Sequence, residues 1–192
     1  MADDYSGVYS GASHFAQRSE FEVQRTNHFE VVLNLSNILD GDPNAEGASE
    51  HIRLSTKSIG TPKVSSEAIS LKHGNDTVKV AAAPTYEDLQ LTVHDTLGKD
   101  QVALMQAWFN KVFDRKTKLM GRVGAYKTNG ILYMYAPDGS VVRKWELEGV
   151  WPKGFGMGAE FSYDSSETMT ITVDLSVDRY FEDTKINNIK NG

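Results

Sequence analysis

Five histidines are the residues best suited to acid–base or metal chemistry, at positions 14, 28, 51, 73 and 94. Neighbouring histidines are at least 14 residues apart, so no His-x-x-x-His pair places two ligands on one helix face. The chain has no cysteine, which excludes a thiolate metal site and a disulfide scaffold. His94-Asp95 could form an acid–base pair, but a polar strand end is the more ordinary interpretation. The sequence therefore predicts no metal site and no cofactor.

Two carboxylates and a glycine run are the other candidates for chemistry. Asp174 and Asp178 share a strand face, but four strand residues separate them by roughly 13 Å. That exceeds the about 6.5–9.5 Å of an inverting glycosidase pair. The run from Gly154 to Gly158 lacks the Gly-x-x-x-x-Gly-Lys pattern of a phosphate loop, and Ser165 and Ser166 lie outside any Gly-x-Ser-x-Gly elbow. The sequence predicts no enzyme.

The most regular element is a predicted strand over residues 168–178. Its apolar side chains all fall on one face: Met169, Ile171, Val173, Leu175 and Val177. The other face carries Thr168, Thr170, Thr172, Asp174, Ser176 and Asp178. A period of two is typical of an extended strand whose two faces differ in burial. We expect the apolar face to lie in the core.

The rest of the chain is predicted to be mainly β. Alternation and turn residues indicate strands over 28–36, 51–58, 89–94, 131–135 and 141–150, with Trp151-Pro152 ending the last, and a short strand beginning at Phe161 and Tyr163. Residues 63–81 are predicted to form a long projecting hairpin, and 99–113 the one amphipathic helix. We expect two packed antiparallel sheets forming a β-sandwich or barrel, with one flanking α-helix.

Composition places limits on the class of protein. The chain has 192 residues, with 20 basic and 26 acidic side chains and a net charge of −6. That charge argues against a general nucleic-acid binder. The sequence predicts no signal peptide, because the start is acidic, and no membrane anchor. We expect an extended N-terminal arm over 1–27, one domain over 28–181 and a tail over 182–192.

Three blocks of sequence carry a family resemblance. They are Thr85 to Asp95 (TYEDLQLTVHD), Trp145 to Pro152 (WELEGVWP), and Tyr163 to Ser166 followed by the strand that leads to Tyr180-Phe181. In this order and spacing they resemble the tail tube protein of contractile-tailed bacteriophages. The resemblance covers about residues 28–181.

The resemblance implies a virion protein whose hexameric rings stack into the inner tube of a contractile tail. It implies as partners other copies of the chain, the tail sheath protein, baseplate and tail-completion proteins, and genomic DNA that passes without specific binding. It also implies assembly in the cytoplasm of the bacterial host. Six copies of a chain of net charge −6 give about −36 per ring, which would repel phosphate.

Three sets of contact residues are hypotheses at this point. Contacts between rings are assigned to the hairpin residues Ser70, Leu71, Lys72, His73, Gly74, Asn75, Asp76, Thr77 and Val78. Contacts of the arm with a neighbouring subunit are assigned to Tyr5, Tyr9 and Phe15. The tube lumen is assigned to Thr170, Thr172, Asp174, Ser176 and Asp178, which are short and polar or acidic.

Two alternatives stay open. One is the secreted tube of a type VI secretion system or related contractile injection device, which shares the fold. The other, from a different class, is a monomeric β-barrel that binds a small ligand, with Trp145, Trp151 and Tyr133 lining its pocket.

Overall fold

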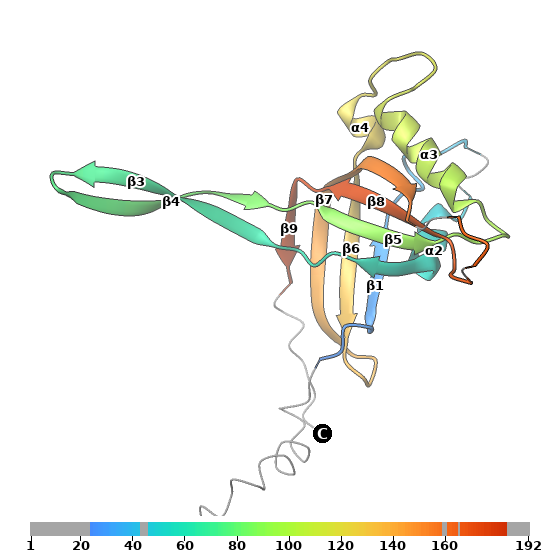
Figure 1. Ribbon diagram of the computed structural model, residues 1–192, viewed down its shortest axis with the longest axis horizontal. Coiled ribbons are helices and arrows are strands. Elements are labelled where there is room, and N and C mark those ends of the chain that lie inside the picture. Colours follow the sequence, from blue (N-terminus) through green and yellow to red (C-terminus); the bar gives the residue numbers. More distant parts are fainter. Residues whose placement is uncertain (1–23, 43–45, 159–160, 165, 184–192) are drawn as a thin grey trace, which may run out of the picture.

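The computed structural model describes residues 24–42, 46–158, 161–164 and 166–183. Its body consists of two antiparallel sheets that share one long strand, β7 (Figure 1). The first sheet contains β1 (Phe29–Leu33), β6 (Thr128–Tyr135), β7 (Val141–Met157) and β9 (Arg179–Glu182). The second contains the later part of β7 with β8 (Thr170–Ser176), β5 (Leu89–His94) and β2 (Thr56–Ile59). The predicted fold class, mainly β with two antiparallel sheets, is confirmed.

Strand β7 joins the sheets because it changes partners along its length. Residues 141–150 pair with β6, and from Trp151 onward the strand pairs with β8. The prediction that Trp151-Pro152 ends this strand is wrong. Pro152 is opposite Leu175, and the register shifts directly after it, between Pro152 and Gly154. A proline, which lacks a backbone N–H, is tolerated at such an irregularity.

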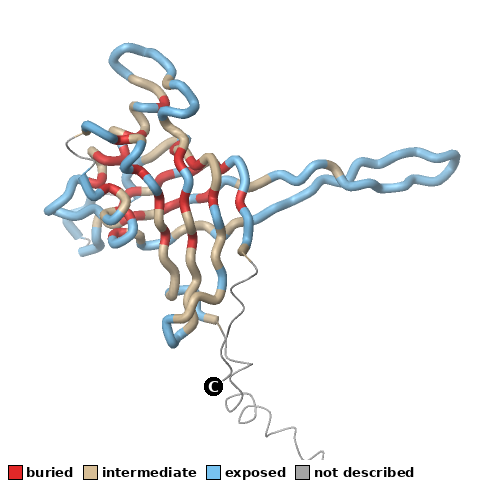
Figure 2. Tube along the Cα trace, turned by 180° about the vertical axis from the view of Figure 1, so that it is seen from behind, coloured by how far each residue is buried: buried red, intermediate tan, exposed pale blue. Residues whose placement is uncertain are grey.

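The core lies between the two sheets, where alternate side chains of each strand are buried (Figure 2). On β8 the predicted alternation is confirmed, since Ile171, Val173 and Leu175 are each at most 1% exposed. The strand spans residues 170–176 and is therefore shorter than predicted at both ends. β1 contacts β2, which lies at the other end of the strand order, so the sheets enclose this core.

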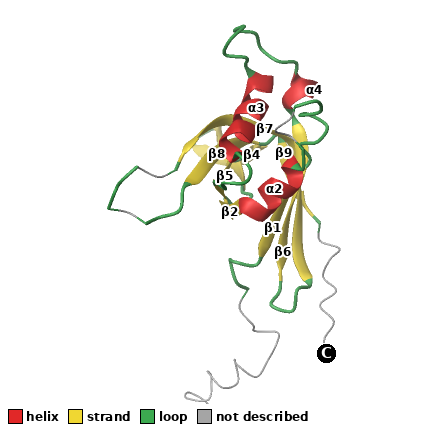
Figure 3. Ribbon diagram, turned by 90° about the vertical axis from the view of Figure 1, so that its right-hand side faces the viewer, coloured by secondary structure: helices red, strands yellow, loops and turns green. Residues whose placement is uncertain are grey.

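Helix α3 (Gln101–Val112) packs on β7 and β8 at one end of the sheets, as predicted (Figure 3). Asp100 caps it, its carboxylate accepting a hydrogen bond from the backbone N–H of Ala103 at 2.8 Å. Trp108 is fully buried, and its indole Nε1–H donates to the carbonyl of Tyr126. That bond ties α3 to the short helix α4 (Val123–Tyr126).

The predicted strand over 51–58 is wrong in its first half, which belongs to helix α2 (Ala48–Ser55). Ala48 and Ile52, four residues apart, are both buried against the core, whereas Leu54 is 72% exposed. A strand would place Ile52 and Leu54 on one face, but a spacing of four belongs to a helix. With α2 and α4, the structure has more than the single helix expected.

The short strand predicted at Phe161 and Tyr163 is also wrong. The described residues 161–164 contain no strand and end in a turn. Phe161 is 81% exposed and Tyr163 is fully exposed. The alternation of these two aromatic residues therefore does not reflect burial of one strand face.

The predicted projecting hairpin is confirmed and is longer than expected. It consists of β3 (Val64–His73) and β4 (Asp76–Tyr86), which form a separate two-stranded sheet. β4 continues to Tyr86, beyond the predicted end of the hairpin at residue 81. The ribbon extends far from the body and is exposed along almost its whole length (Figures 1 and 2).

Candidate assembly interface

The hairpin tip is a two-residue turn whose geometry the sequence specifies. Gly74 has φ +63, and no non-glycine residue of the tip has a positive φ. A glycine with positive φ at the first central position is the pattern of a type II′ turn, whose twist matches that of the strands it joins. His73 pairs with Asp76 across this turn. The tip is therefore a regular turn.

The pairing register gives the hairpin one apolar face. Ile69 is directly opposite Val80, and Leu71 is directly opposite Val78. Residues directly opposite each other in an antiparallel pair point to the same side, as do residues two apart in a strand. The four side chains therefore lie on one face, and they are 40–52% exposed. Ser70 opposite Lys79 and Lys72 opposite Thr77 form the polar face.

This apolar face was not predicted from the sequence, because apolar and polar residues alternate only weakly over residues 63–81. The available signal was the turn itself. If Gly74 and Asn75 form the turn, pairing the residues on either side of it in order places Leu71 opposite Val78 and Ile69 opposite Val80. All nine predicted tip residues, Ser70 to Val78, are exposed.

The base of the hairpin is anchored to the body. Lys63 Nζ lies 2.7 Å from a carboxylate oxygen of Glu87, and this hydrogen bond raises the pKa of the lysine. The ring of Tyr86 packs edge-on against Tyr180 of β9, with 5.1 Å between ring centroids. Two residues beyond Tyr86, Asp88 accepts a hydrogen bond from Lys153 at 2.7 Å. These contacts fix the direction in which the free end of the ribbon projects.

The residues predicted to face a lumen lie along and just beyond β8. Thr170 is only 6% exposed in this subunit, whereas Asp174 and Asp178 are exposed. Asp174 accepts a hydrogen bond from Gln90 Nε2 at 3.1 Å, and Lys127 Nζ lies 2.6 Å from Asp178. The two carboxylates therefore have separate partners. Thr172 and Ser176 are partly exposed.

The arm residues Tyr5, Tyr9 and Phe15 lie outside the described residues.

The other residues considered for chemistry have structural positions. His94 ends β5, and its Nδ1 lies 3.4 Å from the hydroxyl of Thr168. Gly154 and Gly156 are part of β7. Within the described residues, no group of three or more His, Asp or Glu side chains could hold a metal ion. The same part of the chain contains no helix long and apolar enough to cross a membrane.

A groove of about 640 Å³ runs between β2 and the β6–β7 face. Tyr133 and Trp145 line it together with Phe29 and Ile59. Trp151, the third residue expected in a ligand pocket, packs instead against the ring of Tyr126 with 5.7 Å between centroids. The three aromatic residues of the ligand-binding alternative are therefore not brought together.

A comparison with protein families identifies the chain. A family model described as T4-like virus tail tube protein gp19 matches residues 25–180, which include the whole hairpin and every strand of the two sheets except the end of β9. The chain belongs to the T4-like virus tail tube protein family. The resemblance seen in the sequence is thereby confirmed, and the chain is a tail tube component of a phage-like particle.

Solved structures share the fold of this tail tube protein. The tube-terminating cap of the anti-feeding prophage is 16% identical, with a TM-score of 0.63 over 84% of this chain and 91% of the other. A chain of the PVC extracellular contractile injection system, from its sheath–tube complex in the extended state, is 14% identical, with a TM-score of 0.61 over 89% and 96%. The PVC sheath/tube terminator is 14% identical, with a TM-score of 0.62 over 86% and 99%. No curated protein matches the chain.

Proposed function

We propose that this chain assembles into hexameric rings that stack to form the inner tail tube of a contractile bacteriophage, through which genomic DNA is ejected. The sheath surrounds this tube, and the baseplate and tail-completion proteins bind its ends. The particle assembles in the host cytoplasm, and the chain catalyses no reaction. The family match over residues 25–180 supports the phage tube over the secreted tube of a type VI secretion system.

The observation that carries the proposal is the exposed apolar face of the hairpin. A two-stranded ribbon alone is at best marginally stable in water. The ribbon of this protein nevertheless projects from the body with Ile69, Leu71, Val78 and Val80 each 40–52% exposed. Covering the exposed part of one such side chain gives on the order of 1 kcal/mol. A neighbouring ring supplies the cover, repeated at every subunit, and residues Ser70 to Val78 make this contact.

The proposed role as a DNA conduit is supported by the negative net charge of the chain. The chain carries a net charge of −6, and a closed ring of such subunits repels phosphate. We assign the lumen wall to the exposed Asp174 and Asp178 and the partly exposed Thr172 and Ser176, with the buried Thr170 supporting them. The acidic wall disfavours adhesion of DNA during passage.

The test changes one hairpin face at a time. L71S/V78S removes two apolar side chains that lie opposite each other on the apolar face. S70A/K79A changes two side chains that lie opposite each other on the polar face. We expect L71S/V78S to fold with the wild-type circular dichroism spectrum and melting temperature but to form no tubes in negative-stain microscopy. S70A/K79A should form normal tubes. Normal tubes from L71S/V78S would show that this face makes no contact between rings.

A further inference from the structure

The two ends of helix α3 carry opposite charge. At its C-terminal end, the segment from Lys111 to Arg122 contains five exposed cations and one acidic residue. We call these cations the basic end: Lys111, Arg115, Lys116, Lys118 and Arg122. The protein as a whole is acidic, with a net charge of −6. The charge is therefore segregated on the molecule.

The acidic residue of this segment, Asp114, is used to fold the loop. Its carboxylate accepts hydrogen bonds from the hydroxyl of Thr117 at 2.7 Å and the backbone N–H of Lys116 at 2.8 Å. These bonds lower the pKa of the carboxyl group. The backbone N–H groups of Lys118 and Asp114 donate to the carbonyls of Asp114 and Leu119, respectively. The cations are thus displayed by an ordered loop.

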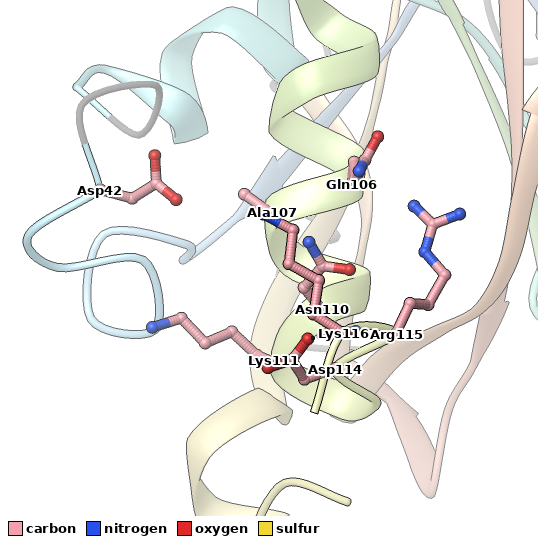
Figure 4. Close-up of a pocket in the computed structure, with 8 residues that line it drawn as sticks. All are labelled: Asp42, Gln106, Ala107, Asn110, Lys111, Asp114, Arg115 and Lys116. Carbon is pink, nitrogen blue, oxygen red and sulfur yellow. Dashed lines mark hydrogen bonds between the residues drawn. The ribbon is translucent and has the colours of Figure 1, made fainter. Parts of the chain in front are cut away.

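The cations of the basic end are not paired with carboxylates of the residues that the structure describes. Figure 4 shows Lys111 and Arg115 extending on opposite sides of α3. With Lys116 they line a cavity of about 560 Å³ against Asp42. Apolar side chains lie beside them, because Leu119 and Met120 are 68% and 71% exposed.

The N-terminal end of α3 has the complementary composition. Asp95, Lys99 and Asp100 lie in the loop before the helix, and Asp164 and Glu167 lie in the loop before β8, so acidic residues outnumber the one lysine. The two loops are adjacent, because the Asp95 N–H donates to the Met169 carbonyl at 3.0 Å. We call this region the acidic end. Its exposed apolar side chains are Leu97, Phe161 and Tyr163, with exposed fractions of 111%, 81% and 110%.

We infer that the basic end of one subunit docks on the acidic end of a second copy of this chain. Each end combines an excess of charge of one sign with exposed apolar side chains, so a head-to-tail contact complements both. Such a contact is heterologous and repeats from copy to copy, as a ring or stacked array requires. The inference rests on the proposed self-assembly and names a second interface besides the hairpin.

A nucleic acid fits the basic end less well than a protein does. Phosphate recognition uses cations and polar groups, whereas Leu119, Met120 and Val123 add an apolar surface with 58–71% exposure. An acidic protein surface that carries Leu and aromatic side chains can cover both components. The acidic end of another copy is such a surface.

Charge reversal with rescue tests the contact. We expect R115E/K118E and D95K/D164K each to reduce the assembled fraction at least about tenfold, because each change places like charges opposite one another. The quadruple variant restores the attraction and should assemble to within a few-fold of wild type. The control, R25E/K57E, makes the same charge change at exposed sites outside both ends. It should assemble normally.

The readouts are sedimentation velocity and negative-stain microscopy at matched protein concentration, with the melting temperature as a check on folding. Wild-type protein that stays monomeric would contradict the proposed function itself. If wild-type protein assembles and both reversals assemble equally well, only the head-to-tail contact is wrong. Lack of rescue in the quadruple variant, or equal loss in the control, would also overturn it. The contact would also be overturned if the wild-type protein bound duplex DNA and R115E/K118E abolished this binding without affecting assembly.

Discussion

Gly149 lies where β7 passes from one sheet to the other. Its φ is +67, a left-handed conformation that other residues adopt only with strain. A Cβ at this position would lie 2.1 Å from the Asp178 Oδ2 atom. That carboxylate is the partner of Lys127, at 2.6 Å. The glycine therefore leaves space for an ion pair that ties Lys127, the residue before β6, to the residues following β8.

We predict that G149A lowers the free energy of unfolding by about 1–3 kcal/mol, through backbone strain and displacement of Asp178. The measurement is urea denaturation followed by circular dichroism. G154A is the matched control in the same strand, because a Cβ there meets no heavy atom within 4 Å. The control should stay within about 0.5 kcal/mol of wild type. Equal effects of the two substitutions would contradict this account of the bend.

Tyr135 forms a hydrogen-bonded group with two neighbouring elements. Its hydroxyl donates to Glu30 of β1 at 2.6 Å, and Glu30 also pairs with Arg53 of α2 at 3.0 Å. Burial, followed by the bond to Glu30, raises the pKa of Tyr135 from 10.0 to about 12. The folded protein therefore keeps this proton at a pH where the unfolded chain releases it.

We predict that Y135F lowers stability by about 1 kcal/mol at neutral pH, through loss of the hydrogen bond. Between pH 10 and about pH 12, Tyr135 ionises in the unfolded wild-type chain but stays protonated in the folded protein. This ionisation stabilises the unfolded state. This contribution reduces wild-type stability in that range and is absent in Y135F. The difference between the two proteins should therefore shrink as pH rises from 10 to 12. A constant difference in urea denaturation across this range would show that Tyr135 titrates alike in both states.

Among the elements, helix α2 shows how a short amphipathic segment can be misinterpreted. Its buried residues are Ala48, Ile52 and Ser55, and Arg53 holds it to Glu30 of β1. We predict that I52A lowers the free energy of unfolding by about 2–5 kcal/mol, because Ile52 is fully buried. L54A, two residues away and 72% exposed, should change it by no more than about 0.5 kcal/mol. Similar losses from both variants in thermal or urea unfolding would support the strand originally expected.

The elements that could be predicted are those with long, uninterrupted periods. β8 and α3 each bury one face along their length, so the sequence records that face directly. α2 has only two turns, too few to distinguish a spacing of four from a spacing of two. The strand predicted over 141–150 was shorter than β7, because a proline such as Pro152 normally ends a strand. In the structure, a register shift accommodates this proline. Such a shift depends on the partner strand, which local sequence does not specify.

The projecting hairpin could be predicted from the sequence, but its apolar face could not. Gly74 and its neighbours indicated a projecting hairpin with a tight turn, and the structure confirms it. Its apolar face depends on the cross-strand register, and the opposed ends of α3 depend on loops distant in sequence coming together. Asp95 directly follows β5 and Asp164 lies in the loop before β8, and these two strands pair only in the folded chain. The adjacency of the two loops, through Asp95 and Met169, is therefore a property of topology.

At the scale of the whole molecule, the subunit has a closed core and open contact surfaces. The two sheets bury their alternate side chains between them, while the hairpin and both ends of α3 expose apolar groups. Soluble monomers rarely leave such groups uncovered, and exposed patches of this kind mark interaction sites. These exposed groups are consistent with the proposed assembly of the chain.

We propose that this chain assembles into a tube without other proteins. The most direct test is electron microscopy of the purified wild-type protein over a range of concentrations. We predict rings with six-fold symmetry that stack into hollow tubes of uniform diameter, with the hairpin of each subunit in contact with the next ring. A protein that stays monomeric at every concentration, or rings whose hairpins point freely into solvent, would contradict the account.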